Sequence, residues 1–442
     1  MPTDIKIETT NKELSSFAGL KIFADLKEKV LPSTFFTDKT IPALKSGIGR
    51  SFDKFGQLLL GFVGGAECLE DMDRFNKDPI FKALNGERLY GSKSHGDFLR
   101  SFSGEHCLNL NKLMSKVSYS LRCEVYKEQS GPVVFDIDST PNEQSGIKME
   151  GVCHNYKGLK CLDTVQVFDD KGYEYWHEVR PGNTHTAKNS PAIIHGVFSS
   201  LPSDGIEKIL RGDSGYCNFA FFSACQIKEV RFVVCMRKLM LKPALSSVKT
   251  WNKQDQKDKS RILFKGGREC EFGETTYSPK GSGHTYRLIV LRSLKEDSAG
   301  KLVTTSDDYD YQGWISSLGN NWDGVEIIKL YRKRGHCENF IRELKNGFDL
   351  KHYPCQKLNA NRAYGIIAAF AYNLVRFVAT KDNLEKPQFS KAIRLCYITI
   401  PCQIVRHARY VTLKLCHFYA KEVSKWLIEI QKLKVGLTVK LI

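Results

Sequence analysis

Four polar residues between positions 331 and 345 have spacings that suit one face of a helix. They are Tyr331, Arg334, Glu338 and Lys345. Because an α-helix turns about 100° per residue, the later three project within roughly 60° of Tyr331, and Arg342 joins them. The apolar residues of the same stretch fall on a neighbouring stripe that would pack on a core. A carboxylate flanked by cations on an open helix face indicates phosphate binding.

Three further acidic residues stand at the ends of predicted strands. Asp136 and Asp138 end an apolar run, and the period-two alternation of a strand places both on the same side of a sheet. One or both can therefore face a shared site. Asp213 closes a later strand between Gly212 and Gly215, where small residues let the backbone turn at the sheet's edge.

A helix packed beside that sheet would bring Glu338 next to the aspartates. Three adjacent carboxylates repel one another, and hard divalent cations relieve the repulsion because they prefer oxygen ligands. Two Mg²⁺ ions about 4 Å apart can activate a nucleophile and stabilise the leaving oxygen of a phosphodiester. Singly, each carboxylate would be assigned to the surface or to a helix cap, but their coincidence with a basic helix face favours a metal site. Mn²⁺ is expected to substitute for Mg²⁺.

The overall charge favours a polyanionic partner. The chain has 66 Lys and Arg against 49 Asp and Glu, a formal net charge of +17 over 442 residues. The excess lies in residues 228–268 and 381–442, each of which is either a solvated face or part of an extended DNA-binding track. Nucleic acid is the first candidate.

Several other classes are disfavoured. The 14 cysteines include no Cys-x-x-Cys pair, so we expect reduced thiols rather than zinc ligands or disulfides. The first twelve residues lack the apolar core of a signal peptide, and the longest apolar run is interrupted by Tyr372 and Asn373. No phosphate-binding loop motif is present. We expect a cytoplasmic protein with no membrane partner and no nucleotide cofactor.

The pattern of elements predicts an α/β fold in five segments. Residues 1–127 are predicted to be helical, and a helical bundle is favoured there over a helix-turn-helix, which stays open. Residues 128–236 predict the order strand, hairpin, helix, strand, helix, strand. Residues 237–323 form a basic, strand-rich insertion, residues 324–380 resume the α/β pattern with helices, and residues 381–442 are predicted to be helical and basic.

These motifs resemble the DDE transposases of bacterial insertion sequences, in the branch with the Tyr-(2)-Arg-(3)-Glu-(6)-Lys signature. Tyr331, Arg334, Glu338 and Lys345 match that spacing without a gap. The contexts Asp-Ile-Asp-Ser-Thr at 136–140 and Arg-Gly-Asp-Ser-Gly at 211–215 also resemble the family. The resemblance covers roughly residues 133–376.

The resemblance implies a ribonuclease-H-like catalytic core, interrupted by the β-rich insertion and flanked by an N-terminal helical DNA-binding domain and a C-terminal helical region. It implies that Asp138, Asp213 and Glu338 are the catalytic metal ligands, with Asp136 a neighbour. It further implies that Arg334 and Lys345 hold phosphates of the transposon end and that Tyr331 contacts the terminal nucleotides.

The function expected on this basis is DNA transposition. The protein would bind transposon-end DNA at terminal inverted repeats, cleave the strands with activated water and join the 3′-hydroxyls to target DNA by two-metal phosphoryl transfer. It would act as a homodimer on paired DNA ends, in the bacterial cytoplasm at the nucleoid. Two alternatives stay open: a metal-dependent nuclease without strand transfer, and an inactive DNA-binding relic of a mobile element.

Overall fold

The structure of the protein is a computed structural model. It describes residues 5, 7–45, 47–86, 88–127, 130–146, 148–252, 263–265, 268–279, 283–295 and 309–433. The chain divides into two units. The helical unit comprises Met1–Lys127, Asn142–Val152 and Arg342–Ile442, and the sheet unit comprises Glu128–Pro141 and Cys153–Ile341.

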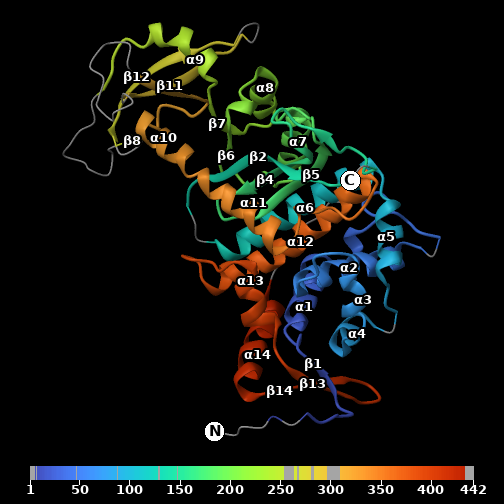
Figure 1. Ribbon diagram of the computed structural model, residues 1–442. Coiled ribbons are helices and arrows are strands. Elements are labelled where there is room, and N and C mark those ends of the chain that lie inside the picture. Colours follow the sequence, from blue (N-terminus) through green and yellow to red (C-terminus); the bar gives the residue numbers. More distant parts are fainter. Residues whose placement is uncertain are drawn as a thin grey trace. The chain divides into compact units, whose positions relative to one another are not determined.

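Apolar runs after residue 132 form the central strands of the sheet unit (Figure 1). The described part of the chain contains a nine-stranded sheet in the order β10-β11-β12-β7-β6-β2-β4-β3, with β5 paired to β4. The strands are β2 (Val133–Glu143), β3 (Cys153–His154), β4 (Lys160–Asp169), β5 (Glu174–Pro181), β6 (Lys208–Gly212), β7 (Arg231–Cys235), β10 (Glu271–Tyr277), β11 (Tyr286–Leu294) and β12 (Tyr309–Ser316). A short hairpin, β8 (Phe264–Lys265) with β9 (Arg268–Glu269), lies outside this sheet.

Strands β2, β6 and β7 are parallel and adjacent, whereas β4 and β5 form an antiparallel hairpin. In the β2–β6 register Asp136 lies opposite Arg211, and Ile137 lies opposite Gly212. The buried Val, Ile, Leu and Phe residues of these strands suit a sheet covered on both faces. Because β2, β6 and β7 run in the same direction, their carboxyl-terminal sides lie at the same edge of the parallel ladder. Open α/β sheets bind ligands at this edge.

The insertion extends the same sheet. Strand β12 runs antiparallel to β7, with Trp314 opposite Cys235, and β11 and β10 follow outward. One apolar core joins β2, β6, β7, β11 and β12 to helix α10 (Gly324–Arg332), and Trp314 is buried in it. The β-rich insertion is thus continuous with the central sheet.

Helices connect the strands as the sequence predicts. Their bounds are α7 (Ser190–Phe198), η2 (Ser214–Tyr216), α8 (Phe219–Ile227), α9 (Lys238–Ala244), η3 (Leu245–Ser247), α10 and α11 (Gly335–Gly347), the last of which is divided between the two units. The predicted order strand, hairpin, helix, strand, helix, strand is confirmed as β2, β4–β5, α7, β6, α8 and β7. The α/β fold class is likewise confirmed.

The prediction of one continuous helix through residues 331–345 is wrong. Helix α10 ends at Arg332 and α11 begins at Gly335. Between them, the Arg334 amide donates to the Tyr331 carbonyl at 2.9 Å, a three-residue spacing tighter than that of an α-helix. Gly335 disfavours continuation because glycine costs roughly 1 kcal/mol in a helix interior. The turn therefore separates Tyr331 and Arg334 from Glu338.

The helical unit is built around one long buried helix. Its helices are α1 (Leu20–Val30), η1 (Ser33–Phe35), α2 (Ile48–Gly64), α3 (Asp71–Phe75), α4 (Pro79–Asn85), α5 (Ser92–Arg100), α6 (Gly104–Val125) and α12 (Leu358–Asp382). Helix α12 packs against α1, α2, α5 and α6. Within the described residues it alone has the length and hydropathy to cross a membrane, and its apolar window is wholly buried. It is the central core helix of this unit.

The prediction of a helical C-terminal region is wrong for residues 402–415. Strands β13 (Cys402–Arg406) and β14 (Val411–Leu415) form a hairpin, and β13 also pairs with β1 (Glu13–Ser15). The β-branched residues of this stretch favour strands over a helix. The prediction holds on either side of the hairpin, where α13 (Ser390–Ile393), a π-helical turn (Arg394–Ile398) and α14 (His417–Lys432) are found.

Helix α5 contains a buried titratable residue that makes the helical unit sensitive to acid. His95 is fully buried, and burial, with a further contribution from the Lys54 ammonium, lowers its pKa to about 4. The unfolded chain, with a histidine pKa near 6.5, binds the proton more tightly. The neutral ring therefore makes its full contribution to the free energy of unfolding above pH 6.5. This contribution, about 3 kcal/mol, is lost as the pH falls toward 4.

His95→Leu should remove this acid sensitivity. Hydrogen exchange of the α5 amides, corrected for intrinsic rates, should give a free energy of opening that falls between pH 7.5 and 5 in the wild type but not in the variant. His417→Leu, an exposed position in the same unit, serves as the control and should keep the wild-type slope. An equal slope in wild type and His95→Leu would contradict the assignment.

Candidate active site

Asp138 and Asp213 lie just beyond the last residue pair of the parallel β2–β6 ladder, Asp138 within β2 and Asp213 directly after β6. Asp138 directly follows Ile137, which pairs with Gly212 of β6, and Asp213 directly follows Gly212. One oxygen of each carboxylate is held by local backbone: Asp138 Oδ1 accepts from the Ser139 amide at 3.0 Å, and Asp213 Oδ1 accepts from the Gly215 amide at 2.9 Å. The structure thus brings these two predicted site residues together.

The two carboxylates interact electrostatically. Burial raises the pKa of Asp138, the Arg334 guanidinium opposes the rise, and the charge of Asp213 adds to it, for a value of about 6. A like charge close enough to act on Asp138 is typical of carboxylates that share a cation. The Asp138 side chain is only 17% exposed, so solvent screens this interaction weakly.

Arg334 is the direct partner of Asp138. Its Nη2 lies 2.9 Å from Asp138 Oδ1 and 3.5 Å from the Ile137 carbonyl. The charge of Asp138 raises the pKa of Arg334 although burial opposes this, so the ion pair is retained. Its Nε is buried and has no hydrogen-bond partner among the described residues. A buried donor without a partner is a position where an anionic oxygen would bind.

Asp136 is committed to a different pair. Arg211 Nε donates to Asp136 Oδ1 at 2.7 Å, and Arg211 Nη2 donates to Asp136 Oδ2 at 2.6 Å. Both side chains are buried, and Arg211 also donates to the Leu330 carbonyl of α10. Asp136 is therefore a structural neighbour of the site. Its register partner Arg211 was the signal that sequence reasoning missed.

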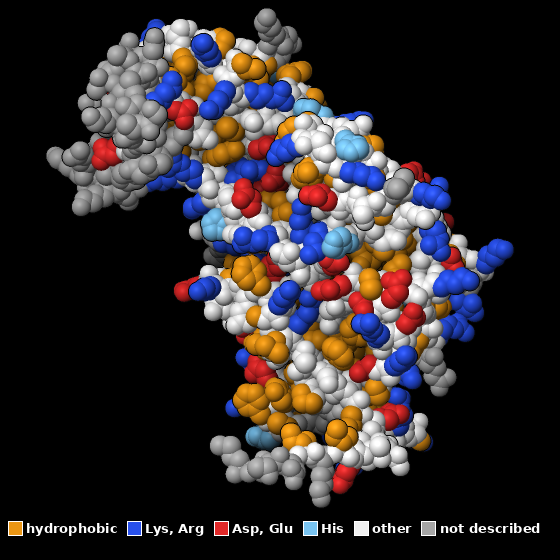
Figure 2. All heavy atoms as spheres, viewed as in Figure 1, with side chains coloured by type: hydrophobic (Ala, Val, Ile, Leu, Met, Phe, Trp, Pro, Cys, Tyr) orange, Lys and Arg blue, Asp and Glu red, His pale blue; other side chains and the backbone are white. Residues whose placement is uncertain are grey.

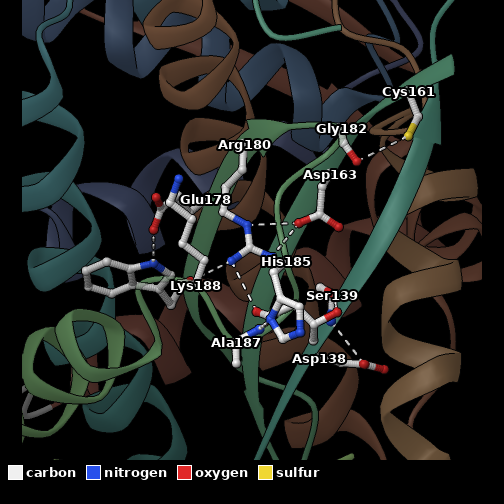
Figure 3. Close-up of polar contacts among 12 residues, drawn as sticks. Asp138, Ser139, Cys161, Asp163, Glu178, Arg180, Gly182, His185, Ala187 and Lys188 are labelled. Carbon is white, nitrogen blue, oxygen red and sulfur yellow. Dashed lines mark hydrogen bonds and ion pairs between the residues drawn. The ribbon is translucent and has the colours of Figure 1, made fainter. Parts of the chain in front are cut away.

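Arg180 holds the loop between β5 and α7 (Figure 3). It pairs with Asp163 on the neighbouring strand β4 and donates through Nη1 to the Lys188 carbonyl at 2.8 Å and to the Thr186 carbonyl at 3.3 Å. Ser139 Oγ donates to Thr186 Oγ1 at 3.3 Å. The loop is therefore fixed beside Asp138, which the local sequence pattern did not predict.

Tyr216 fills the space behind the aspartates. Its ring is fully buried, and its hydroxyl has no hydrogen-bond partner among the described residues. Burial and the nearby charge of Asp138 raise the pKa of this tyrosine well above its ordinary value, with a smaller contribution from Asp213. The hydroxyl is therefore neutral at physiological pH.

Among the described residues, Glu338 completes no metal-binding group with the aspartates. It lies exposed in the first turn of α11, and among the described residues no group of three His, Cys, Asp or Glu side chains is arranged to hold a metal ion. Its neighbour Cys337 is buried, and its pKa is raised first by burial and then by the charges of Asp136 and Asp138. The first turn of α11 thus lies near the part of β2 that carries Asp136 and Asp138.

The remaining residues of the predicted basic face are distributed over two helices. Tyr331, at the end of α10, is half-buried, with its ring centroid 5.7 Å from that of Trp314. Burial and the neighbouring Cys235 raise its pKa far above the ordinary range. Arg342 is exposed and Lys345 is half-buried, both on α11 beyond the turn.

The residues present fit a hard divalent cation in part. Asp138 and Asp213 offer carboxylate oxygens from two adjacent strands, directly after the last pair of their parallel ladder. Oxygen donors of this kind are those that Mg²⁺ prefers, usually through one or two carboxylates. The third carboxylate of the predicted set is outside this group.

Comparison with known families decides the class of the protein. A family model described as "Transposase DDE domain group 1" matches residues 2–435. The chain belongs to the DDE transposase family. No curated protein matches it. The predicted resemblance is confirmed at the level of the family, which acts on DNA and catalyses polynucleotidyl transfer, and the signature branch stays a prediction.

The Asp136–Arg211 pair of this transposase should carry a large part of the sheet's stability. Arg211→Met leaves a buried carboxylate without its partner, a change that typically costs about 3–5 kcal/mol. We expect urea unfolding of the sheet unit to report a loss of this size. The double variant Asp136→Leu/Arg211→Met should recover most of it, because no charge is then left buried.

The matched control is Arg231→Met, an exposed arginine on the adjacent strand β7. It should change the free energy of unfolding by no more than about 0.5 kcal/mol. Equal effects of Arg211→Met and Arg231→Met would show that the buried pair contributes nothing.

Proposed function

We propose that this protein is a Mg²⁺-dependent transposase that binds the terminal inverted repeats of its element, cleaves the strands with activated water and joins the 3′-hydroxyls to target DNA. The observation that carries the proposal is the pair Asp138 and Asp213, which directly follow the last residue pair of the parallel β2–β6 ladder, with Arg334 bound to Asp138. The family supports the transposase class.

The fold supports the finer assignment of a ribonuclease-H-like core. The three parallel strands β2, β6 and β7, the hairpin β4–β5 beside β2, and the intervening helices α7 and α8 follow the order expected for that core. The β-rich insertion separates Asp213 from Glu338 along the chain, as the family pattern requires. Residues 128–236 and 324–380 would then be its two parts.

In this mechanism Asp138 and Asp213 would hold the metal, with Mn²⁺ as a substitute. Two bound divalent ions would activate the attacking oxygen and stabilise the leaving oxygen of the phosphodiester. Arg334 holds Asp138 in place, and its unpartnered Nε would bind an oxygen of the reacting phosphate. Arg180 fixes the loop between β5 and α7, and Thr186 of this loop accepts from Ser139, the residue next to Asp138.

Glu338 is assigned as the third carboxylate on the family's sequence pattern. It lies one turn beyond Arg334, in the part of α11 that borders β2 through the buried Cys337.

DNA contacts are assigned to basic residues outside the metal-binding pair. Arg342 and Lys345 would hold phosphates of the transposon end, and Tyr331 would contact the terminal nucleotides. Figure 2 shows Lys and Arg side chains spread over the visible face of both units, as a polyanionic partner requires. The N-terminal helices of residues 1–127 would bind end DNA, and two protomers would pair on two ends.

A metal-dependent nuclease without strand transfer would use the same carboxylates. An assay for joined products separates the two activities, because only a transposase links a freed 3′-hydroxyl to a second duplex. An inactive relic would bind DNA and release no cleaved strand with either Mg²⁺ or Mn²⁺.

Substitution of the assigned carboxylates should abolish cleavage and joining. Asp138→Asn, Asp213→Asn and Glu338→Gln remove one charged ligand each, and we expect strand cleavage to fall by at least a hundredfold while end-DNA binding survives. The substrate is a duplex with the inverted repeat taken from the DNA that flanks the gene, and products are resolved on a denaturing gel. Full cleavage in any of these variants would reject its assignment.

The matched control is Glu207→Gln, a carboxylate just before the amino end of β6, at the opposite edge of the sheet from Asp213. It should cleave as the wild type does. A second measurement, calorimetric titration with Mn²⁺, should show metal binding in the wild type and in Glu207→Gln and its loss in Asp138→Asn and Asp213→Asn.

Lys345→Ala and Arg342→Ala should each remove one phosphate contact. The slope of log binding constant against log salt concentration is then expected to become shallower by about 0.9 per variant, because one fewer counterion is released. Lys157→Ala, an exposed lysine in the turn between β3 and β4, is the control and should keep the wild-type slope. A slope unchanged by both α11 variants would exclude these contacts.

A further inference from the structure

The carboxyl end of β7 carries an arginine that the assigned site residues do not include. Arg237 lies two residues beyond the end of β7, the third parallel strand, and β7 pairs directly with β6. Asp138 directly follows the last β2–β6 residue pair, Asp213 directly follows β6, and Arg237 lies two residues after β7. Since ligands of open α/β sheets bind at this edge, Arg237 borders the site.

Arg237 is anchored to the turn that carries Asp213. Its Nε donates to the Ser214 carbonyl at 3.0 Å, and its Nη2 donates to the Gly215 carbonyl at 3.3 Å. The same turn supplies the Gly215 amide that holds Asp213 Oδ1. The guanidinium is therefore fixed within one turn of a proposed metal ligand, although the residue is exposed.

Arg237 differs from the other arginines of the site because it has no carboxylate partner among the described residues. Arg180, Arg211 and Arg334 each pair with an aspartate, namely Asp163, Asp136 and Asp138. For Arg237, by contrast, the described part of the chain offers only carbonyl acceptors. Carbonyl oxygens fix its orientation and leave its positive charge uncompensated.

The chemistry of this group suits a phosphate. A guanidinium has five N–H donors, and two hydrogen bonds to carbonyls leave the others for a ligand. Its planar, permanently charged form binds phosphate oxygens in pairs. The adjacent Lys238 side chain is 85% exposed, and its ion pair with Asp310 is long, at 3.7 Å. The anion that reaches this edge would meet an oriented cation beside the two carboxylates.

We propose that Arg237 binds a backbone phosphate of the DNA strand that enters the Asp138–Asp213 site. The inference rests on the proposed function, since DNA is the anion that the site would admit. The contacted phosphate belongs to the reacting strand, next to the scissile position on the β7 side. Arg237 thereby sets the position of that strand relative to Asp213.

The test compares Arg237→Gln, Arg237→Lys and Arg231→Gln. Arg231 is an exposed arginine at the opposite end of the same strand and also donates to a carbonyl, that of Ser317 at 3.3 Å. Binding is measured in EDTA at several salt concentrations, with a duplex carrying the terminal inverted repeat. Arg237→Gln should make the salt slope shallower by about 0.9, whereas Arg237→Lys and Arg231→Gln should keep it.

Single methylphosphonate substitutions around the scissile position identify the phosphate. One substitution should weaken binding by the wild type severalfold and have no further effect on Arg237→Gln, because the contact is already absent. A wild-type salt slope in Arg237→Gln, or equal sensitivity of both proteins to every methylphosphonate, would overturn the proposal. The proposal would also be overturned if Arg237→Gln and Arg237→Lys both bound the duplex more weakly with the wild-type salt slope. That result is expected if Arg237 only stabilises the turn that carries Asp213.

Failure of this inference and failure of the proposed function are distinguishable. If the wild type binds and cleaves the end duplex while Arg237→Gln keeps the wild-type slope, only the Arg237 contact is rejected. If the wild type neither prefers the end duplex to an unrelated one nor cleaves it with Mg²⁺ or Mn²⁺, the proposed function and this contact are both rejected.

Discussion

The buried ion pair between Asp136 and Arg211 is the constraint on which the site depends. Two charges removed from water are tolerable only when each satisfies the other, and the two bonds of 2.6 and 2.7 Å between adjacent strands allow one register of β2 on β6. That register places Asp138 and Asp213 at the same sheet edge. Because Arg211 also binds the Leu330 carbonyl, the end of α10 is fixed to the same pair.

The same principle of paired charges extends outward from this centre. Arg334 compensates Asp138, and Arg180 compensates Asp163 while holding the β5–α7 loop. Each arginine thus does two things: it lowers the cost of a buried carboxylate, and it binds a carbonyl that shapes the edge of the site. Of the four arginines at this edge, Arg180, Arg211, Arg334 and Arg237, only the last has no carboxylate partner in the described residues.

The features that local periodicity controls were predictable from the sequence, and those that depend on long-range pairing were not. Period-two alternation and flanking glycines located Asp138 and Asp213 at strand ends, because both signals are local. The bonds of Arg211 and Arg180 join residues on neighbouring strands, so they follow from register, which the sequence does not state. The C-terminal hairpin was missed for a related reason: its strands are stabilised by β1, almost 400 positions earlier in the sequence.

The break between α10 and α11 explains why Arg334 and Glu338 face different surroundings. On a continuous helix their four-residue spacing would put both side chains on one face. The tight turn at 333–334 instead directs Arg334 to Asp138 and leaves Glu338 exposed. Asp138 Oδ1 already accepts from Arg334, so a cation that binds there competes with the guanidinium.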